Sequence, residues 1–209
     1  MFDLTLSTLV TRILAALVII GLHGFFLALA ARLLGDGQAA RAGRLTVSPF
    51  AHFEPAGFLA LILFGLGWVR PLPLNIGRMR GHRLAVPALL AASLVPVALL
   101  AVVAVSLLPR AAVSFSYSTA PLVAHFLVVL VRLSTSFILS SFLPLAPFCL
   151  GQLLVSSREQ WREFAARARL PLAVAALLLS FLLSYWIGDA VDVVVRHVFG
   201  NIALLSNSR

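Results

Sequence analysis

A single histidine, His23, lies late in a long apolar run that ends at the Gly35-Asp36 turn. Imidazole is costly to place in hydrocarbon, so a histidine inside a membrane segment is a candidate for metal binding or proton transfer. The structural alternative is a histidine hydrogen-bonded to a neighbouring helix, and its position alone favours that alternative. Gly21 and Gly24 thin the helix face beside it and would allow another helix to approach closely.

Arg132 is the side chain most costly to place in a membrane, because it lies deep in another apolar run, 119–140. A charge at the centre of a spanning helix costs at least about 2.5–3.5 kcal/mol on insertion scales. The guanidinium must therefore snorkel or meet a counter-charge. Asp189 and Asp192 are candidates within the chain, and a lipid phosphate or another subunit is equally open. We expect a structural role for this arginine.

The composition around these residues is that of an integral membrane protein. Of 209 residues, 61% are hydrophobic, and the mean hydropathy is +1.05, whereas soluble domains are about 45–50% apolar. The net charge is +9, and all 16 basic residues are arginines that flank apolar runs. No basic patch with interleaved aromatic residues is present, which argues against nucleic acid as a partner. The single cysteine, Cys149, cannot form a disulfide within the chain.

The apolar runs, and the charged residues, glycines and prolines between them, predict the architecture. Five main crossings are predicted, over 13–31, 55–69, 84–109, 119–140 and 170–187. The second is short for a clean crossing of a ~30 Å hydrocarbon core and could be tilted, partial or re-entrant. The first apolar run lacks a small-residue cleavage site and is interpreted as a retained helix. We predict an all-α membrane protein of about five to six transmembrane helices, with a re-entrant or extended segment, forming a single domain over 1–209.

Two stretches are not expected to be ordinary spans. Trp68 to Asn75 cannot be regular helix, because Pro71 and Pro73 force extended backbone. Such backbone persists near membrane depth only where protein or water satisfies it, so the segment either lines a cleft or forms an interfacial loop anchored by Trp68. A charged, solvated helix is predicted over 157–169, and the chain after residue 187 suits the membrane surface.

Three ordered motifs of the first third resemble the site-2 protease family of intramembrane zinc metalloproteases, in its short bacterial form. Residues 43–57, Gly-Arg-Leu-Thr-Val-Ser-Pro-Phe-Ala-His-Phe-Glu-Pro-Ala-Gly, resemble the family's loop Gly-Arg-Leu-Thr-Leu-Asn-Pro-Leu-Ala-His-Ile-Asp-Pro-Ile-Gly. Residues 67–75, Gly-Trp-Val-Arg-Pro-Leu-Pro-Leu-Asn, resemble its Gly-Trp-Ala-Lys-Pro-Val-Pro-Val-Asn segment. Gly35-Asp36 resembles the Gly-Asp that closes the active-site helix. The resemblance implies a protease-like core over 1–156 in a multi-pass protein of the bacterial inner membrane.

The same resemblance points to degenerate active-site positions. Counting back from Gly35 by the family's spacing, the first histidine of its His-Glu-x-x-His motif is His23. Gly24 then stands at the position of the general-base glutamate, and Leu27 at that of the second histidine. The third ligand, an aspartate after a proline-rich run, corresponds to Cys149.

A catalytic zinc needs three protein ligands and an open position for water, and the water needs a base within reach. Because these groups are replaced, we predict no zinc, no catalytic residues and a catalytically inactive relative. The predicted role is that of an accessory or assembly subunit of a larger membrane complex, which binds a transmembrane partner or lipid. The predicted contact residues are Arg132, Trp68, Arg70, Pro71, Pro73, Asn75 and His52.

Two other classes of function stay open at this point. The first is an active zinc metalloendopeptidase with a rearranged site, in which Cys149 supplies a thiolate beside His23 and His52 completes the ligand set. In the family, the histidine at the position of His52 lies in the loop, outside the ligand set. The metal content of the protein would distinguish this alternative from an inactive relative. The second is a small transporter or lipid carrier. The spans show no paired acidic residues and no inverted repeat, which argues against it.

Overall fold

The computed structural model describes residues 5–196, which form helices joined by turns and one extended segment. The helices are α1 (Leu6–Leu33), α2 (Gln38–Arg41), α3 (Pro49–His52), α4 (Pro55–Phe64), the 3-10 turn η1 (Ile76–Arg78), α5 (His82–Ser114), α6 (Ala120–Ser141), α7 (Cys149–Ser156), α8 (Glu159–Arg167) and α9 (Arg169–Val194). This described part of the chain contains no β-strand. The prediction of an all-α membrane protein is confirmed.

Within residues 5–196, four helices are long and apolar enough to cross a membrane, namely α1, most of α5, α6 and α9. They correspond to four of the five predicted crossings. The remaining one, 55–69, contains only α4, whose 10 residues span about 15 Å, half of a ~30 Å hydrocarbon core. Gly65 ends this helix in the left-handed conformation, with φ 77°. Residues 5–196 therefore contain four helices of spanning length and one shorter apolar helix.

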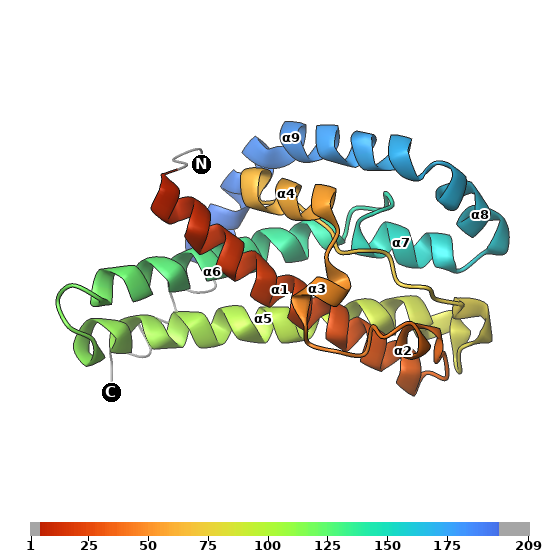
Figure 1. The fold of residues 1–209 in the computed structure, drawn as a ribbon, viewed down its shortest axis with the longest axis horizontal. Coiled ribbons are helices and arrows are strands. Elements are labelled where there is room, and N and C mark those ends of the chain that lie inside the picture. Colours follow the sequence, from red (N-terminus) through yellow and green to blue (C-terminus); the bar gives the residue numbers. More distant parts are fainter. Residues whose placement is uncertain (1–4, 197–209) are drawn as a thin grey trace.

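The core lies where α1 crosses the long antiparallel pair α5 and α6 (Figure 1). Small residues allow the close approach of α1 and α5, among them Ala15, Ala16 and Ala101, all almost fully buried. Phe137 of α6 closes this core beside the middle of α1. Helix α9 covers α4 and part of α6, and most of its surface faces outward. Leu178, Phe181 and Leu182 are exposed there, as expected for a lipid-facing helix.

Helix α9 continues further than the sequence analysis expects. The predicted last span ends at residue 187, with a separate surface helix after it, but α9 runs as one helix through Gly188 to Val194. A single glycine in a helix costs only about 1 kcal/mol, so the apolar residues on both sides keep the helix continuous. The polar residues from Asn201 onward lie outside the described residues.

The region between α6 and α9 consists of turns and two short helices, α7 and α8. Residues 142–148 form turns around a cis Ala146–Pro147 peptide bond, and α7 begins at Cys149. Helix α8 is the predicted charged helix, and none of its residues is buried. Two ion pairs lie along it, Glu159–Arg162 at 3.0 Å and Glu163–Arg167 at 3.4 Å.

Candidate functional site

His23 lies in the interior of the protein, on the buried face of α1. Its ring is completely buried and meets the ring of Phe137 edge-on, with 5.0 Å between the centroids. Neither ring nitrogen makes a well-formed hydrogen bond with the described residues, although the Ser93 backbone faces the ring. The structure therefore places a polar ring in an otherwise apolar contact between α1, α5 and α6.

The next residue, Gly24, packs directly against the imidazole of His52. A Cβ atom built on Gly24 would lie 2.2 Å from both Cγ and Nδ1 of that ring. One turn earlier, a Cβ atom on Gly21 would lie 2.6 Å from the Val47 carbonyl oxygen. The thin face predicted on α1 is thus used for close approach, but by α3 and the loop before it rather than by a spanning helix.

His52 is held in that position by its own hydrogen bonds. Its Nε2 atom lies 2.9 Å from the Thr46 carbonyl oxygen, and its backbone carbonyl accepts the Arg70 N–H at 2.9 Å. Burial lowers the pKa of His52 below its ordinary value; the Thr46 carbonyl opposes this, and the Arg44 charge adds to it. The ring is therefore neutral at pH 7, with Nε2 donating to Thr46 and Nδ1 facing the α1 backbone at Gly24.

Cys149 opens α7 on the other side of this core. Its Sγ atom lies 4.0 Å from Ser93 Oγ, whose hydroxyl donates to the Leu90 carbonyl at 3.0 Å. Burial raises the pKa of the Cys149 thiol to about 12, with Ser93 opposing the shift. The group at this position is therefore a buried, protonated thiol packed against α5.

A zinc ion would need several ligands close together at this site. Within residues 5–196, no three His, Cys, Asp or Glu side chains are grouped closely enough to hold a metal ion. His23, His52 and Cys149 consequently do not form the three-ligand set that a rearranged metal centre requires. Leu27, one turn after His23, is fully buried among apolar side chains. Residues 5–196 therefore offer no three-ligand set for a catalytic zinc.

The extended segment after α4 is the second feature of the site. Along residues 70–74 the buried side chains are Leu72 and Leu74, whereas Arg70, Pro71 and Pro73 are exposed. Extended backbone at the two prolines is confirmed. The alternation follows from the period of two in an extended chain, and it turns one row of side chains into the core.

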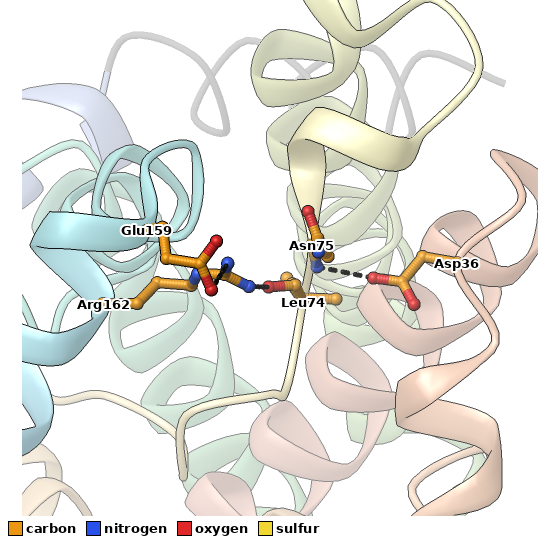
Figure 2. Close-up of polar contacts among 5 residues, drawn as sticks. All are labelled: Asp36, Leu74, Asn75, Glu159 and Arg162. Atoms are coloured by element: carbon orange, nitrogen blue, oxygen red, sulfur yellow. Dashed lines mark hydrogen bonds and ion pairs between the residues drawn. The ribbon is translucent and has the colours of Figure 1, made fainter.

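Side chains from both flanks hold this segment, as Figure 2 shows. On one side the buried Asp36 carboxylate accepts the Asn75 N–H at 2.6 Å and the Gln38 N–H at 2.9 Å. On the other side Arg162 reaches the Leu74 carbonyl at a long 3.5 Å, while Glu159 pairs with the same guanidinium. The Asp36 contact is short and charge-assisted, so it is the firmer of the two anchors.

A groove runs along the Arg162 side of this segment. It has a volume of about 510 Å³ and lies between residues 70–74, the turn at 146–147, α7, α8 and the start of α9. Arg70, Arg162 and Arg169 line it, and no acidic side chain of the described residues does. The amide of Gln152 also reaches the Leu72 carbonyl, at 3.5 Å. This basic groove is not apparent in the sequence, because its walls come from segments about 80 residues apart.

Burial restricts the set of predicted contact residues. Trp68 is 3% exposed and packs against Phe148, and His52 is fully buried against α1. Both side chains are therefore inaccessible from the surface in this structure, and their predicted contact with a partner stays a prediction. Arg70, Pro71 and Pro73 are exposed, and Asn75 is half-buried beside Asp36. Asp36 and Gln152 contact the backbone of this segment, but the sequence analysis did not predict these roles. The Gly35-Asp36 turn indicated only where the first helix ends.

Arg132 finds its counter-charge within the chain. Its guanidinium lies 2.8 Å from the Asp192 carboxylate of α9. Of the alternatives open in the sequence, the structure selects an intramolecular pair. The Arg132 side chain is still 56% exposed, and its predicted contact with a partner or lipid stays a prediction.

Comparison with known proteins finds similarity over part of the chain. A curated protein of Bacillus subtilis (strain 168), described as "Putative zinc metalloprotease YwhC", is 34% identical over 80 residues. That alignment covers 38% of this chain and 36% of the relative, so the chain matches about a third of that protein's length. No family model and no solved structure matches the chain. The similarity indicates a site-2-protease-like relationship for a multi-pass membrane protein.

Proposed function

We propose that this protein is a non-catalytic, site-2-protease-like protein of the bacterial inner membrane, an accessory subunit that holds a partner's transmembrane segment. The single observation that carries the proposal is the contact between Gly24 and the His52 ring. By the resemblance, residue 24 is the position of the general base. Here the space that its side chain would occupy is filled by a neutral imidazole anchored to Thr46.

The basic groove is the surface that we assign to the partner. The N–H groups of Leu72 and Leu74 make no hydrogen bond with the described residues. The carbonyls of the same two residues have only the long side-chain contacts from Gln152 and Arg162. In an extended chain the N–H and C=O groups of alternate residues point the same way, so these four groups face the groove. An unpaired edge of this kind can receive a second extended segment by main-chain pairing.

The charge of the groove indicates the class of partner. Three arginines line it without an acidic neighbour among the lining residues. A transmembrane segment that unwinds near an acidic juxtamembrane stretch would complement both the charge and the open backbone edge. The partner proposed here is therefore a membrane protein with aspartate or glutamate residues next to its spanning helix.

Site-specific photo-crosslinking in the native membrane tests this proposal. A photo-reactive amino acid replaces Pro73, which is exposed at the groove, and in a control it replaces Leu99, which is 58% exposed on α5. We expect position 73 to give one discrete protein adduct and position 99 to give only lipid adducts. The adduct should weaken when Arg169 is replaced by glutamate. Equal lipid labelling at both positions would contradict the proposal.

A further inference from the structure

A larger cavity, of about 900 Å³, lies away from the groove, between the first turns of α1, the middle of α6 and the last turns of α9. Small-molecule sites occupy about 300–1,000 Å³, so this cavity is large enough for a ligand. Among the described residues, four charged side chains line it, Arg12, Arg132, Asp189 and Asp192. Neither the degenerate protease positions nor the proposed partner groove makes use of it.

The charges of this cavity are segregated by helix. The two guanidinium groups come from α1 and α6, and the two carboxylates come from α9. Arg132 pairs with Asp192 at 2.8 Å, and both side chains remain substantially exposed, at 56% and 41%. The two guanidinium groups are close enough for their positive charges to repel. A ligand that offers negative charge to one wall and positive charge to the other would complement both.

Arg12 and Asp189 are the side chains that would bind the negative and the positive end of such a ligand. Arg12 donates to the Ile62 carbonyl at 2.8 Å, which fixes its guanidinium at the end of α4 and at the wall of the cavity. Asp189 is exposed, and it makes no hydrogen bond or ion pair with residues 5–196. A carboxylate on a membrane helix is costly without a cationic neighbour. The cavity thus has two guanidinium groups on one wall, and on the other wall a paired carboxylate, Asp192, beside the unpaired carboxylate of Asp189.

The cavity begins at the first residues of α1, where a lipid headgroup can enter, and it extends inward to Arg132 in the middle of α6. Thr5 and Thr8 line it at the start of α1, and Arg12 lies six residues after Leu6, about 9 Å along the helix axis. The polar headgroup layer is about 5–8 Å thick on each side of the hydrocarbon core. A helix that begins at the membrane surface therefore carries Arg12 to the boundary between headgroups and hydrocarbon.

We propose that this cavity binds the headgroup of one zwitterionic phospholipid with a primary ammonium, of the phosphatidylethanolamine type. The phosphate lies against Arg12 and Arg132, since guanidinium groups match phosphate geometry. The ammonium donates to Asp189. An anionic headgroup without an ammonium would face two carboxylates, and a free cation would face two guanidinium groups. A quaternary ammonium, as in phosphatidylcholine, has no N–H to donate to the carboxylate.

Lipid retention by the full-length protein tests the proposal without any variant. Delipidated protein in detergent is offered phosphatidylethanolamine, its mono- and dimethylated forms, phosphatidylcholine and phosphatidylglycerol, each at equal concentration. Native mass spectrometry then counts the lipids that each chain retains. We expect one retained phosphatidylethanolamine, with retention falling about tenfold over the methylation series as charge-assisted hydrogen bonds are lost. Equal retention of all five lipids, or preference for phosphatidylglycerol, would overturn the assignment.

A pair of charge-neutralising variants locates the site. Asp189→Asn should abolish the preference for the primary ammonium, and Asp189→Glu should restore it. Glu163→Gln removes the same charge from α8, outside the cavity, and should retain lipid like the parent protein. Preference that persists in Asp189→Asn would show that the lipid binds elsewhere. Since the groove and its crosslink at position 73 do not involve this cavity, failure of one proposal leaves the other standing.

Discussion

Gly24 and His52 interlock so closely that a Cβ atom on Gly24 would lie 2.2 Å from two atoms of the imidazole. Real Cβ atoms do not approach a neighbour this closely, so a side chain at residue 24 requires the ring to move. The ring is anchored at Nε2 by Thr46, and the His52 backbone carbonyl also holds the extended segment at Arg70. The contact therefore connects the core of α1 to the segment that borders the groove.

Gly24→Ala should destabilise the protein by about 1–3 kcal/mol, because overpacking forces neighbouring side chains and backbone to shift. Thermal unfolding of the purified protein in detergent measures this. Gly77→Ala is the matched control, since a Cβ atom there meets only Asn75 Oδ1 at 3.7 Å. Combining Gly24→Ala with His52→Ala should cost less than the sum of the two single changes. Equal stability of the two alanine variants would contradict the interlock.

Acid should weaken the fold through His52. Because its pKa is lowered in the folded state, the unfolded chain binds a proton first as pH falls below about 6.5, the ordinary value for histidine. Stability is then lost between that pH and the lower folded pKa. His52→Gln keeps a donor for Thr46 but cannot titrate, so it should lose less stability between pH 7.5 and pH 5. Parallel pH dependence of the two proteins would argue against a buried neutral ring.

Asp36 should anchor the extended segment more strongly than α8 does. Its carboxylate accepts two backbone N–H groups, from Gln38 and Asn75, and hydrogen bonds to charged groups contribute about 1.5–3 kcal/mol. Asp36→Ala should speed hydrogen exchange of residues 72–76 by at least about tenfold. Glu159→Gln, whose carboxylate is 82% exposed, should change that exchange little. If both variants exchange alike, the anchor lies elsewhere.

Arg132 and Asp192 should contribute modestly to stability as a pair. Both side chains are about half exposed, and such pairs contribute up to about 1 kcal/mol. A double-mutant cycle with Arg132→Gln and Asp192→Asn, read by detergent-titrated unfolding, should give a coupling of this size. A coupling of zero would return Arg132 to the set of residues that seek an external counter-charge.

Much of the fold follows from local patterns in the sequence. Long apolar runs mark the four spanning helices, and the prolines at 71 and 73 mark the extended segment, because each signal acts within one stretch. The apolar run at 55–69 was harder to interpret. Its composition is that of a span, but Gly65 and the residues after it end the helix after ten residues, and only the structure shows how short α4 is.

The candidate site depends on contacts between distant stretches, and these were not predictable. Asp36 binds Asn75 across 39 positions, and Arg12 reaches the Ile62 carbonyl across 50. The two glycines on α1 correctly signalled a close approach, but they did not say that His52 would provide it. The sequence offered two aspartates as possible partners of Arg132. Only the packing of α6 against α9 shows that Asp192 is the one that forms the ion pair.

Metal analysis of the purified protein tests the central claim most directly. The protein is produced with ample zinc, purified without chelators, and assayed for zinc per chain beside His23→Ala. We predict substoichiometric zinc that does not differ between the two, because residues 5–196 hold no three-ligand group. One zinc per chain in the parent protein, lost in His23→Ala, would contradict a non-catalytic role and restore a rearranged metalloprotease site.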